Sequence, residues 1–355
     1  MKKQVSCFLA LFFCAISFSA FTQTINVKSA DGATDIIYTN PNDLQKAIDA
    51  ATAGSTITLS GGVFNTANAA INISKEIHLI GAGFLTDSAL QTSRTYVGSG
   101  QLTLKSGSDN STLEGFEINS TIRVADNGSA TLKNIFINKV KTPNINCGVS
   151  TTISGSGGKI VSNLIISNCV TALINCGYAT QVQIYNNVFS YNYNNISYLN
   201  GSAEINNNIF LGYSYIVYRI DNCTIKNNIF RYGAKIDGSN NTAYNNLSTN
   251  DWLTSSGTNT ISSNNISNVT LSDIFQKYDE NNISFDNIYL LDLRIKAGSA
   301  ATGKGTDGKD IGIYGGSGFR VKPSIPFIDF KEVAKQTNAQ GQLPVNIRVK
   351  AQGNN

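Results

Sequence analysis

The amino-acid sequence predicts an all-β fold, a parallel β-helix in which one chain winds into stacked coils of short strands. The first observation is a repeat, because IYNNVF at residues 184–189 recurs as INNNIF at 205–210 and IKNNIF at 225–230. The second is its period of 21 and then 20 residues, which is typical of one solenoid coil per repeat. The third is the composition, since 41% hydrophobic and 14% charged residues suffice for a large ordered core.

Residues 1–20 have the pattern of a signal peptide. Lys2 and Lys3 precede an apolar run over residues 5–18, and small residues follow at Ser19 and Ala20. A basic start, an apolar stretch and a small-residue cleavage site are typical of secretory leaders. We therefore expect an exported protein that is secreted, periplasmic or held at the cell surface.

Residues 21–60 are expected to form an N-terminal cap and the first strand. Four apolar residues recur at helical spacing, namely Leu44, Ala47, Ile48 and Ala51. Asn42 can cap the start of this helix, and Gly54 can end it. Such a helix would cover the open end of the coil stack, which is otherwise an aggregation-prone edge. We expect strands at residues 56–60 and 77–80.

Residues 61–318 are expected to form the coils. Weaker copies of the repeat extend it over at least residues 113–267. Because Asn tolerates the left-handed backbone of tight turns, each unit is predicted to be a strand, an Asn turn and a strand. Stacking about 4.8 Å apart would align the asparagines into a hydrogen-bonded ladder, and the isoleucines and phenylalanines into internal columns. A leucine-rich repeat has a similar period, but its fixed leucine pattern is missing.

The order of these features resembles secreted right-handed parallel β-helix proteins of the pectate-lyase-like superfamily. The resemblance rests on the helix at 44–51, the strand GSTITL at 54–59, residues 77–83 and the NNxF coils. The segment GTDGKDIGIYGG at 305–316 is similar to the closing motif of exported bacterial β-helix proteins, particularly those of Bacteroidetes. The resemblance covers about residues 25–318 and implies a right-handed coil. It implies no single activity, since this superfamily holds lyases, hydrolases, esterases, epimerases and adhesins.

Residues 319–355 form a tail outside the coils. Pro323 and Pro326 indicate a linker, and residues 328–330 and 345–349 alternate as two short strands around Gly341. We expect a β-hairpin that folds back on the solenoid. The alternative is a sorting or docking element that contacts a surface protein partner.

The composition excludes several classes of function. The chain has one histidine, His78, which removes most Ser-His-Asp, Cys-His and multi-histidine metal schemes. The net charge is +4, and the surplus of Lys and Arg beyond the leader lies in residues 296–355, too dilute for nucleic-acid binding. No stretch after the leader is long and apolar enough to span a membrane. The tripeptide RIK at 294–296 matches polygalacturonases, but their aspartate and histidine motifs are missing, so we interpret it as coincidence.

The coil register groups tyrosines and charged residues on neighbouring coils. When Asn186, Asn207 and Asn227 are set as equivalent, Tyr198 and Arg219 are equivalent too. The candidates for glycan contact are Tyr191, Tyr213, Tyr215 and Tyr232. The charged candidates near them are Arg219, Arg231, Lys235 and Asp237. Tyrosine rings stack on sugars and charged groups bind their hydroxyls, although an ordinary solvated turn region is the alternative interpretation.

These features favour a noncatalytic exported β-helix protein that binds a glycan or acts as a surface scaffold. The alternative is a polysaccharide lyase or related enzyme acting on an acidic polysaccharide. Lys235 or Arg231 would then be the base, and Arg219 would neutralise the substrate carboxylate. A lyase on this fold could require Ca²⁺, and otherwise no cofactor or metal is indicated. The motifs of uronate lyases and pectinesterases are missing from the sequence, which favours the binding protein.

Four cysteines follow the leader, and two of them occupy equivalent places. INCG occurs at residues 145–148 and 174–177, so Cys147 and Cys176 should stack on consecutive coils. A spacing of about 4.8 Å lies within the Cα range of a disulfide, although parallel core side chains often remain thiols. Both states are therefore open. The Gly/Ser/Thr-rich insertion at 149–158 is expected to be an exposed loop.

Two pairs of acidic residues have structural explanations. Asp307 and Asp310 lie among glycines, but the full repeat of calcium-binding β-rolls is missing. We therefore expect a closing turn there rather than a metal site. Glu114 and Glu117 are three apart on a predicted strand, so they should face opposite sides and cannot act as a carboxylate pair.

Overall fold

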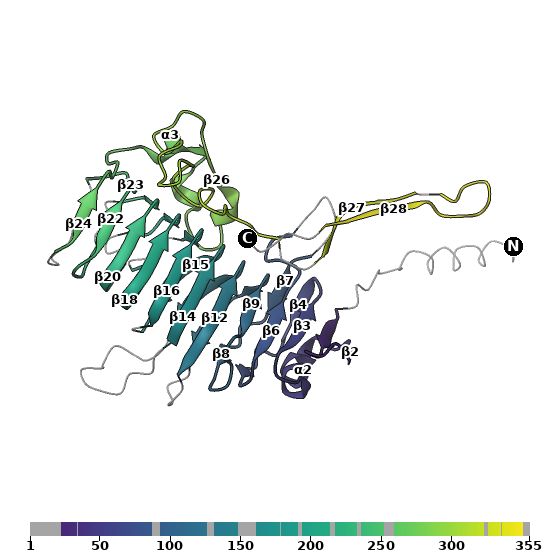
Figure 1. Ribbon diagram of the computed structural model, residues 1–355. Coiled ribbons are helices and arrows are strands. Elements are labelled where there is room, and N and C mark those ends of the chain that lie inside the picture. The colour runs from purple at the N-terminus through teal and green to yellow at the C-terminus, as the bar shows by residue number, and fades with distance from the viewer. Residues whose placement is uncertain are drawn as a thin grey trace, which may run out of the picture.

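The computed structural model is a right-handed parallel β-helix whose coils stack along one axis (Figure 1). It describes residues 23–33, 35–86, 93–125, 131–147, 161–177, 179–190, 194–213, 217–232, 236–251, 259–322, 326–334 and 336–350. The expected leader at 1–20 and the expected loop at 149–158 lie outside the described residues. The predicted fold class is confirmed, because the coils contribute strands to three parallel sheets.

Sheet 1 runs along the whole stack, with each strand paired in parallel to the next. Its strands are β3 (Ser55–Leu59), β6 (Ile77–Ile80), β9 (Thr112–Glu114), β12 (Leu132–Asn138), β14 (Val161–Ser167), β16 (Thr180–Tyr185), the second halves of β18 (Ile196–Asn206) and β20 (Val217–Lys226), β22 (Thr242–Tyr244) and β24 (Ile261–Ser263). Two of these begin where predicted or within one residue of it, because β3 and β6 match the expected strands at 56–60 and 77–80.

Sheets 2 and 3 share two continuous strands, β13 and β15. Sheet 2 contains β4 (Gly62–Phe64), β7 (Thr95–Val97), β10 (Glu117–Ile118), the first parts of β13 (Lys141–Asn146) and β15 (Val170–Asn175), β17 (Val188–Phe189), β19 (Ile209–Phe210), β21 (Ile229–Phe230) and β23 (Leu247–Ser248). Sheet 3 contains β5 (Ile71–Ile73), β8 (Leu102–Leu104), β11 (Thr121–Val124), the second parts of β13 and β15, and the first halves of β18 and β20.

The first asparagine of each repeated pair forms the corner between sheets 1 and 2, which we call the asparagine corner. Its backbone is left-handed, with φ of +54° at Asn186, +55° at Asn207 and +57° at Asn227. Asn populates this region more readily than most residues, because its short polar side chain can hydrogen-bond locally. The repeat therefore contains Asn where the chain must turn sharply.

The second asparagine of each pair is buried and forms the predicted ladder. The Nδ2 of Asn187 donates to Oδ1 of Asn208, and the Nδ2 of Asn208 donates to Oδ1 of Asn228, both at 3.0 Å. The same Oδ1 atoms accept backbone N–H groups, such as that of Asn187 at 2.9 Å. The ladder begins at Cys169, whose N–H donates to Oδ1 of Asn187. These bonds satisfy backbone groups that the sharp corner would otherwise leave buried without partners.

The two apolar residues after the Asn pair face opposite ways. The inner column contains Phe189, Phe210 and Phe230, stacked with ring centroids 4.5 and 4.8 Å apart. The outer column contains Val188, Ile209 and Ile229, which belong to a second hydrophobic core. The prediction of internal columns is confirmed for the phenylalanines and for the column of Ile184, Ile205 and Ile225. It is wrong for this outer column, because alternation along a strand places one of two neighbours outside.

The second core lies between sheet 2 and residues 269–320, which we call the covering segment. The covering segment contains α3 (Leu271–Ile274), β25 (Phe275–Lys277), η2 (Glu280–Asn282), η3 (Ile288–Leu290) and β26 (Asp292–Ile295). Strands β25 and β26 pair antiparallel. Phe275, Ile311 and Ile313 are buried against the outer column of sheet 2. Burial of this apolar surface stabilises the arrangement in the same way as an ordinary core.

The N-terminal cap contains the predicted helix and an antiparallel ribbon. A turn of 3-10 helix, η1 (Pro41–Asp43), leads into α2 (Leu44–Ala50), whose predicted apolar side chains are buried. Asn42 does not cap α2, whose N-cap is Asp43, because Pro41 starts an earlier turn. That turn, η1, is capped by Asn40, whose side chain accepts from the N–H of Asn42. Strand β1 (Ile25–Lys28) pairs antiparallel with β3, and β2 (Asp35–Tyr38) pairs with β1. This ribbon covers the edge of the first coil.

The C-terminal hairpin forms as predicted from β27 (Phe327–Val333) and β28 (Val345–Lys350). Figure 1 shows it extending away from the solenoid, so the expectation that it folds back is wrong. The covering segment already occupies the apolar outer face of sheet 2, and β28 is exposed along its whole length. Among the described residues, no helix has the length and hydrophobicity to cross a membrane.

Candidate functional site

The bend between sheets 3 and 1 carries a group of aromatic and charged side chains. Tyr198 and Arg219 are equivalent there, because Ser197 pairs with Tyr218 and Leu199 pairs with Ile220. The Arg219 guanidinium carbon lies 5.7 Å from the ring centroid of Tyr198 and 5.1 Å from that of Tyr218. The two rings meet edge to face, with centroids 6.0 Å apart. We call these residues, with Asp237, the bend cluster.

The backbone of the bend cluster is strained. Tyr198 has φ of +59° and Arg219 has φ of +51°, a conformation that bulky side chains rarely adopt. Asp237 lies beside them on the next coil, where its N–H donates to Val217 O at 3.0 Å and its C=O accepts from Ile220 N at 2.9 Å. Arg219 is exposed, and the two tyrosines are half-buried. The rings and the guanidinium therefore form one surface on adjacent coils.

A second group lies where the chain leaves sheet 2. The rings of Tyr213 and Tyr232 meet edge to face with centroids 4.9 Å apart, and Tyr213 is 43% exposed. The guanidinium carbon of Arg231 lies 4.5 Å from the Tyr232 ring centroid. Cation–π contact of this kind is favourable at partly exposed sites. These three residues are brought together as the register suggested, and we call them the corner cluster.

Arg231 is held by the covering segment. Its Nε donates to Oε2 of Glu280 at 2.7 Å, and the Tyr278 hydroxyl donates to Oε1 of the same carboxylate at 3.0 Å. Partial burial alone would lower the pKa of Arg231, but the hydrogen bond and charge of Glu280 outweigh it and raise that pKa above its ordinary value. A guanidinium so stabilised keeps its proton. The arrangement suits a fixed cation and does not suit a general base.

The remaining predicted residues divide as follows. Tyr191, Tyr215 and Lys235 lie outside the described residues. The described charged candidates separate, because Arg219 contacts Tyr198 and Tyr218 on sheet 3, whereas Arg231 contacts Tyr232 beside sheet 2. Sequence reasoning missed Tyr218, since counting a fixed offset from the asparagine corner selects one position per coil. The signal that could reveal it is the adjacent Tyr-Arg pair at 218–219, one coil after Tyr198.

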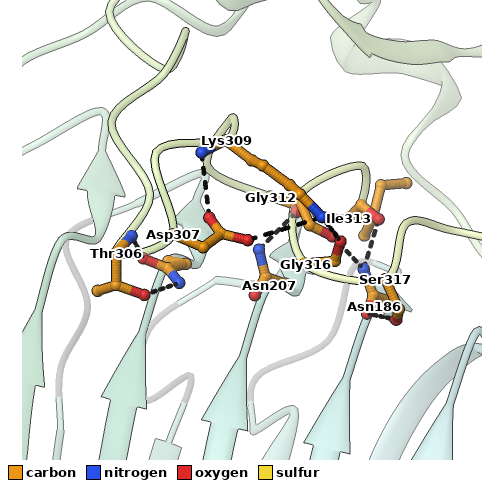
Figure 2. A network of polar contacts seen from close by, with 11 residues as sticks. Asn186, Asn207, Thr306, Asp307, Lys309, Gly312, Ile313, Gly316 and Ser317 are labelled. Atoms are coloured by element: carbon orange, nitrogen blue, oxygen red, sulfur yellow. Dashed lines mark hydrogen bonds and ion pairs between the residues drawn. The ribbon is translucent and has the colours of Figure 1, made fainter. Parts of the chain in front are cut away.

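Residues 302–320, which we call the closing strap, run along the asparagine corner (Figure 2). The corner asparagines bind it with their side chains. The Nδ2 of Asn227 donates to Thr306 Oγ1 at 2.9 Å, that of Asn207 to Gly312 O at 3.2 Å, and that of Asn186 to Ile313 O at 2.6 Å. The first asparagine of the repeat therefore has two roles, in the turn and in docking the strap.

The acidic residues of the strap are used within its own turns. The Oδ1 of Asp307 accepts from the N–H of Lys309 at 3.1 Å, and the Oδ1 of Asp310 accepts from the N–H of Gly303 at 2.9 Å. Within the described part of the chain, no three His, Cys, Asp or Glu side chains are close enough to hold a metal ion. The geometry of Asp307 and Asp310 is that of a closing turn.

Cys147 and Cys176 lie on adjacent coils. Asn146 pairs with Asn175, and the N–H of Cys147 donates to Asn175 O at 2.7 Å. Both side chains are thiols in the structure, as are those of Cys169 and Cys223, and all four are buried. Burial raises the pKa of Cys147, Cys169 and Cys223 to about 12. These thiols belong to the core, where a raised pKa keeps them protonated and unreactive.

Glu114 and Glu117 do not share one strand. Gly115, with φ of +74°, makes a corner between them, so Glu114 ends β9 and Glu117 begins β10. Each carboxylate pairs with its own lysine, Glu114 with Lys139 at 3.0 Å and Glu117 with Lys141 at 3.3 Å. The predicted placement on opposite faces of a strand is therefore wrong, because a corner intervenes. The two carboxylates still do not pair with each other.

Comparisons with protein-family models and with curated proteins find no match to this chain. The architecture itself supports many unrelated activities. The function must therefore be inferred from the geometry of the side chains.

Proposed function

We propose that this chain is an exported, noncatalytic β-helix protein that binds a glycan through the bend cluster, with the corner cluster as a second contact surface. The observation that carries the proposal is the pair Tyr198 and Arg219, two bulky residues in left-handed backbone at equivalent positions. Such strain costs about 1–3 kcal/mol per residue and tends to collect at binding sites. A merely solvated bend would be served better by Asn or Gly, as at the asparagine corner.

The chemistry of the bend cluster suits a sugar chain. The half-buried rings of Tyr198 and Tyr218 offer apolar surface for the C–H face of a sugar ring. The exposed guanidinium of Arg219 can donate in pairs to hydroxyl or carboxylate oxygens. Adjacent coils repeat every 4.8 Å or so, which lets neighbouring contacts follow one extended chain. An exported location, as the leader pattern indicates, would bring the protein into contact with polysaccharide.

The lyase alternative is less well supported. A lyase needs a deprotonated base, and the pair with Glu280 holds Arg231 protonated. The other candidate base, Lys235, lies outside the described residues. Arg219 could neutralise a substrate carboxylate, but that role alone gives binding without elimination. We therefore favour binding over catalysis.

The test compares affinity and stability in the same variants. We expect Tyr198→Ala and Tyr218→Ala each to weaken polygalacturonate or xylan binding by about 1–3 kcal/mol through lost stacking area. Tyr96→Ala is the matched control, because Arg94 lies over that half-buried ring at 5.4 Å on sheet 2, and we expect unchanged binding. Affinity electrophoresis and thermal melts supply the two readouts. Unchanged binding with a large drop in melting temperature would assign the two rings to packing.

A separate assay addresses catalysis. The protein is incubated with polygalacturonate, with and without Ca²⁺, and the ultraviolet absorbance of an unsaturated product is followed. We expect no product in either condition. Product formation that Lys235→Ala abolishes, while polysaccharide binding persists, would show that the lyase alternative is right.

A further inference from the structure

A concave site lies beside the asparagine corner, on the coils of β9, β12 and β14 and on the first Asn-Asn repeat, which begins in β16. Its cavity measures about 400 Å³ and is lined by side chains from β9, β12, β14 and β16 and by the end of the closing strap. Pockets of 300–1,000 Å³ commonly hold small molecules. The site is separate from the bend and corner clusters, because it lies where sheet 1 meets sheet 2.

The first unusual feature of this pocket is Lys139. In the column of left-handed corner residues, Gly115 precedes it and Asn168 and Asn186 follow it, yet Lys139 has φ of +53°. Its side chain is buried at 2% exposure, and its Nζ lies 3.0 Å from Oε1 of Glu114, which is 4% exposed. A buried ion pair is weak evidence for stability, because desolvating both charges offsets their attraction. An Asn would be sufficient to form the left-handed turn. The turn therefore does not explain why a buried ion pair lies at the pocket.

The second unusual feature is an apolar floor on the outer face of sheet 1. Phe136 and Ile165 pair with each other, and their neighbours in the same outward column are Thr112 and Gln183. Both apolar side chains are half-buried and line the cavity, together with Tyr185. The other residues of this outward column are polar from Thr56 to Thr242, and the next apolar one is Ile261 on the last coil. The apolar surface is therefore concentrated where the cavity is.

The closing strap forms the opposite wall. Ser317 Oγ donates to Asn186 Oδ1 at 3.2 Å, and the N–H of Arg320 donates to Asn168 Oδ1 at 2.9 Å. These bonds fix the strap beside the cavity, where the side chain of Arg320 contributes to the lining. The lining includes two cations, Lys139 and Arg320, and one anion, Glu114. The pocket therefore carries a net positive charge next to an apolar floor.

We propose that this pocket binds a small cyclic carboxylate. The ring lies on Phe136, Ile165 and Tyr185, and the carboxylate faces Arg320, with the buried Lys139–Glu114 pair beneath it. The ring of the ligand buries the apolar side chains of the floor, which is favourable. A guanidinium binds a carboxylate with two parallel hydrogen bonds. An aromatic acid and a sugar acid share this chemistry. The inference does not depend on glycan binding at the bend cluster.

The experiment is isothermal titration of the full chain without residues 1–20, using four probes. The probes are phenylacetate, galacturonate, benzyl alcohol and inorganic phosphate. We expect at least one of the two carboxylates to bind at least tenfold more tightly than benzyl alcohol and phosphate, and the tighter one identifies an aromatic or a sugar acid as the source. Tyr218→Ala should leave this binding unchanged, which separates the pocket from the proposed glycan surface.

Variants test the two recognition elements. Arg320→Gln should weaken carboxylate binding at least tenfold, and Arg320→Lys, which keeps the charge but loses the paired hydrogen bonds, should weaken it less than Arg320→Gln does. Phe136→Thr copies Thr112 of the preceding coil and should weaken binding at least tenfold. Lys277→Gln removes an exposed cation on β25 and should change nothing. Thermal melts of each variant show whether it is folded.

Several outcomes overturn the proposal. It fails if neither carboxylate binds at 10 mM or if benzyl alcohol or phosphate binds as tightly as the carboxylates. It also fails if folded Arg320→Gln and Phe136→Thr proteins bind the carboxylate like the unmodified chain. If Lys277→Gln weakens binding as much as Arg320→Gln does, the effect of Arg320 comes from net charge alone. That outcome also overturns the proposal.

Discussion

Removing one rung of the asparagine ladder should destabilise the solenoid strongly. Asn228 is fully buried. Its Nδ2 donates to Ile205 O at 2.8 Å, Lys226 O at 2.9 Å and Asn246 Oδ1 at 3.0 Å. Its Oδ1 accepts from the backbone N–H of Asn208 at 2.9 Å and from the Nδ2 of Asn208 at 3.0 Å. Asn228→Ala removes all of these bonds at once.

The magnitude follows from the groups left behind. The backbone N–H of Asn208 loses the acceptor that Asn228 supplies in a fully buried place, and the carbonyls of Ile205 and Lys226 lose a donor. A buried donor or acceptor without a partner costs about 1–3 kcal/mol, and loss of the side-chain volume adds to this. We therefore expect a loss of about 3–5 kcal/mol in the free energy of unfolding. The free energy of unfolding of a whole domain is only about 5–15 kcal/mol.

The assay is equilibrium urea unfolding followed by far-ultraviolet circular dichroism. The control is Asn206→Ala, which lies on the preceding coil two residues before Asn208 and whose amide donates to the exposed Glu204 at 3.1 Å. We expect the control to change the free energy of unfolding by no more than about 0.5 kcal/mol. A loss below about 1 kcal/mol for Asn228→Ala, or equal losses for both variants, would refute the reasoning about the ladder.

Four further predictions concern the core, its thiols and the coil register. Phe210→Ala removes the middle ring of the stacked column, and urea unfolding should show a loss of about 3–5 kcal/mol, whereas a loss under 1 kcal/mol would mean that the rings do not pack as described. The thiols of Cys147, Cys169 and Cys223, whose pKa burial raises to about 12, should not react with a thiol reagent at pH 8 until urea is added, and rapid native reaction would contradict their burial. Because the unfolded thiols ionise near pH 9 while the folded ones stay protonated, stability should also fall as pH rises from about 9 to 12. Deleting the whole coil at residues 203–222 should lower the melting temperature less than deleting residues 203–212, since only the first deletion keeps strand register, and equal damage would argue against the solenoid.

The coil architecture could be predicted because its cause is local and repeated. The first Asn of each pair adopts the left-handed backbone of the corner, as at Asn186, Asn207 and Asn227. The second Asn of each pair forms the same buried hydrogen bonds on every coil. A period of 20 or 21 residues places these asparagines at equivalent positions on successive coils. The same register places Tyr213 beside Tyr232.

Features that depend on distant segments could not be predicted in this way. Ile209 and Ile229 face outward because the covering segment, which begins forty residues after Ile229, supplies the apolar partner. Glu280 reaches Arg231 from that same segment, and no local pattern signals the pair. Asn42 does not cap α2, because Pro41 begins an additional turn before it and that turn is capped by Asn40. Lys139 occupies a corner position that is Asn on later coils, and its ion pair with Glu114 could not be predicted from the sequence.

The central claim is that strained side chains at the bend bind a glycan, and one glycan-array experiment tests it most directly. The chain without residues 1–20 is screened beside a Tyr198→Ala/Tyr218→Ala/Arg219→Gln variant and the Tyr96→Ala control. The account predicts selective binding by the unmodified chain and the control, and at least a tenfold loss in the triple variant, about 1.4 kcal/mol. If the unmodified chain binds no glycan, or the folded triple variant binds the same glycans equally well, the account is contradicted.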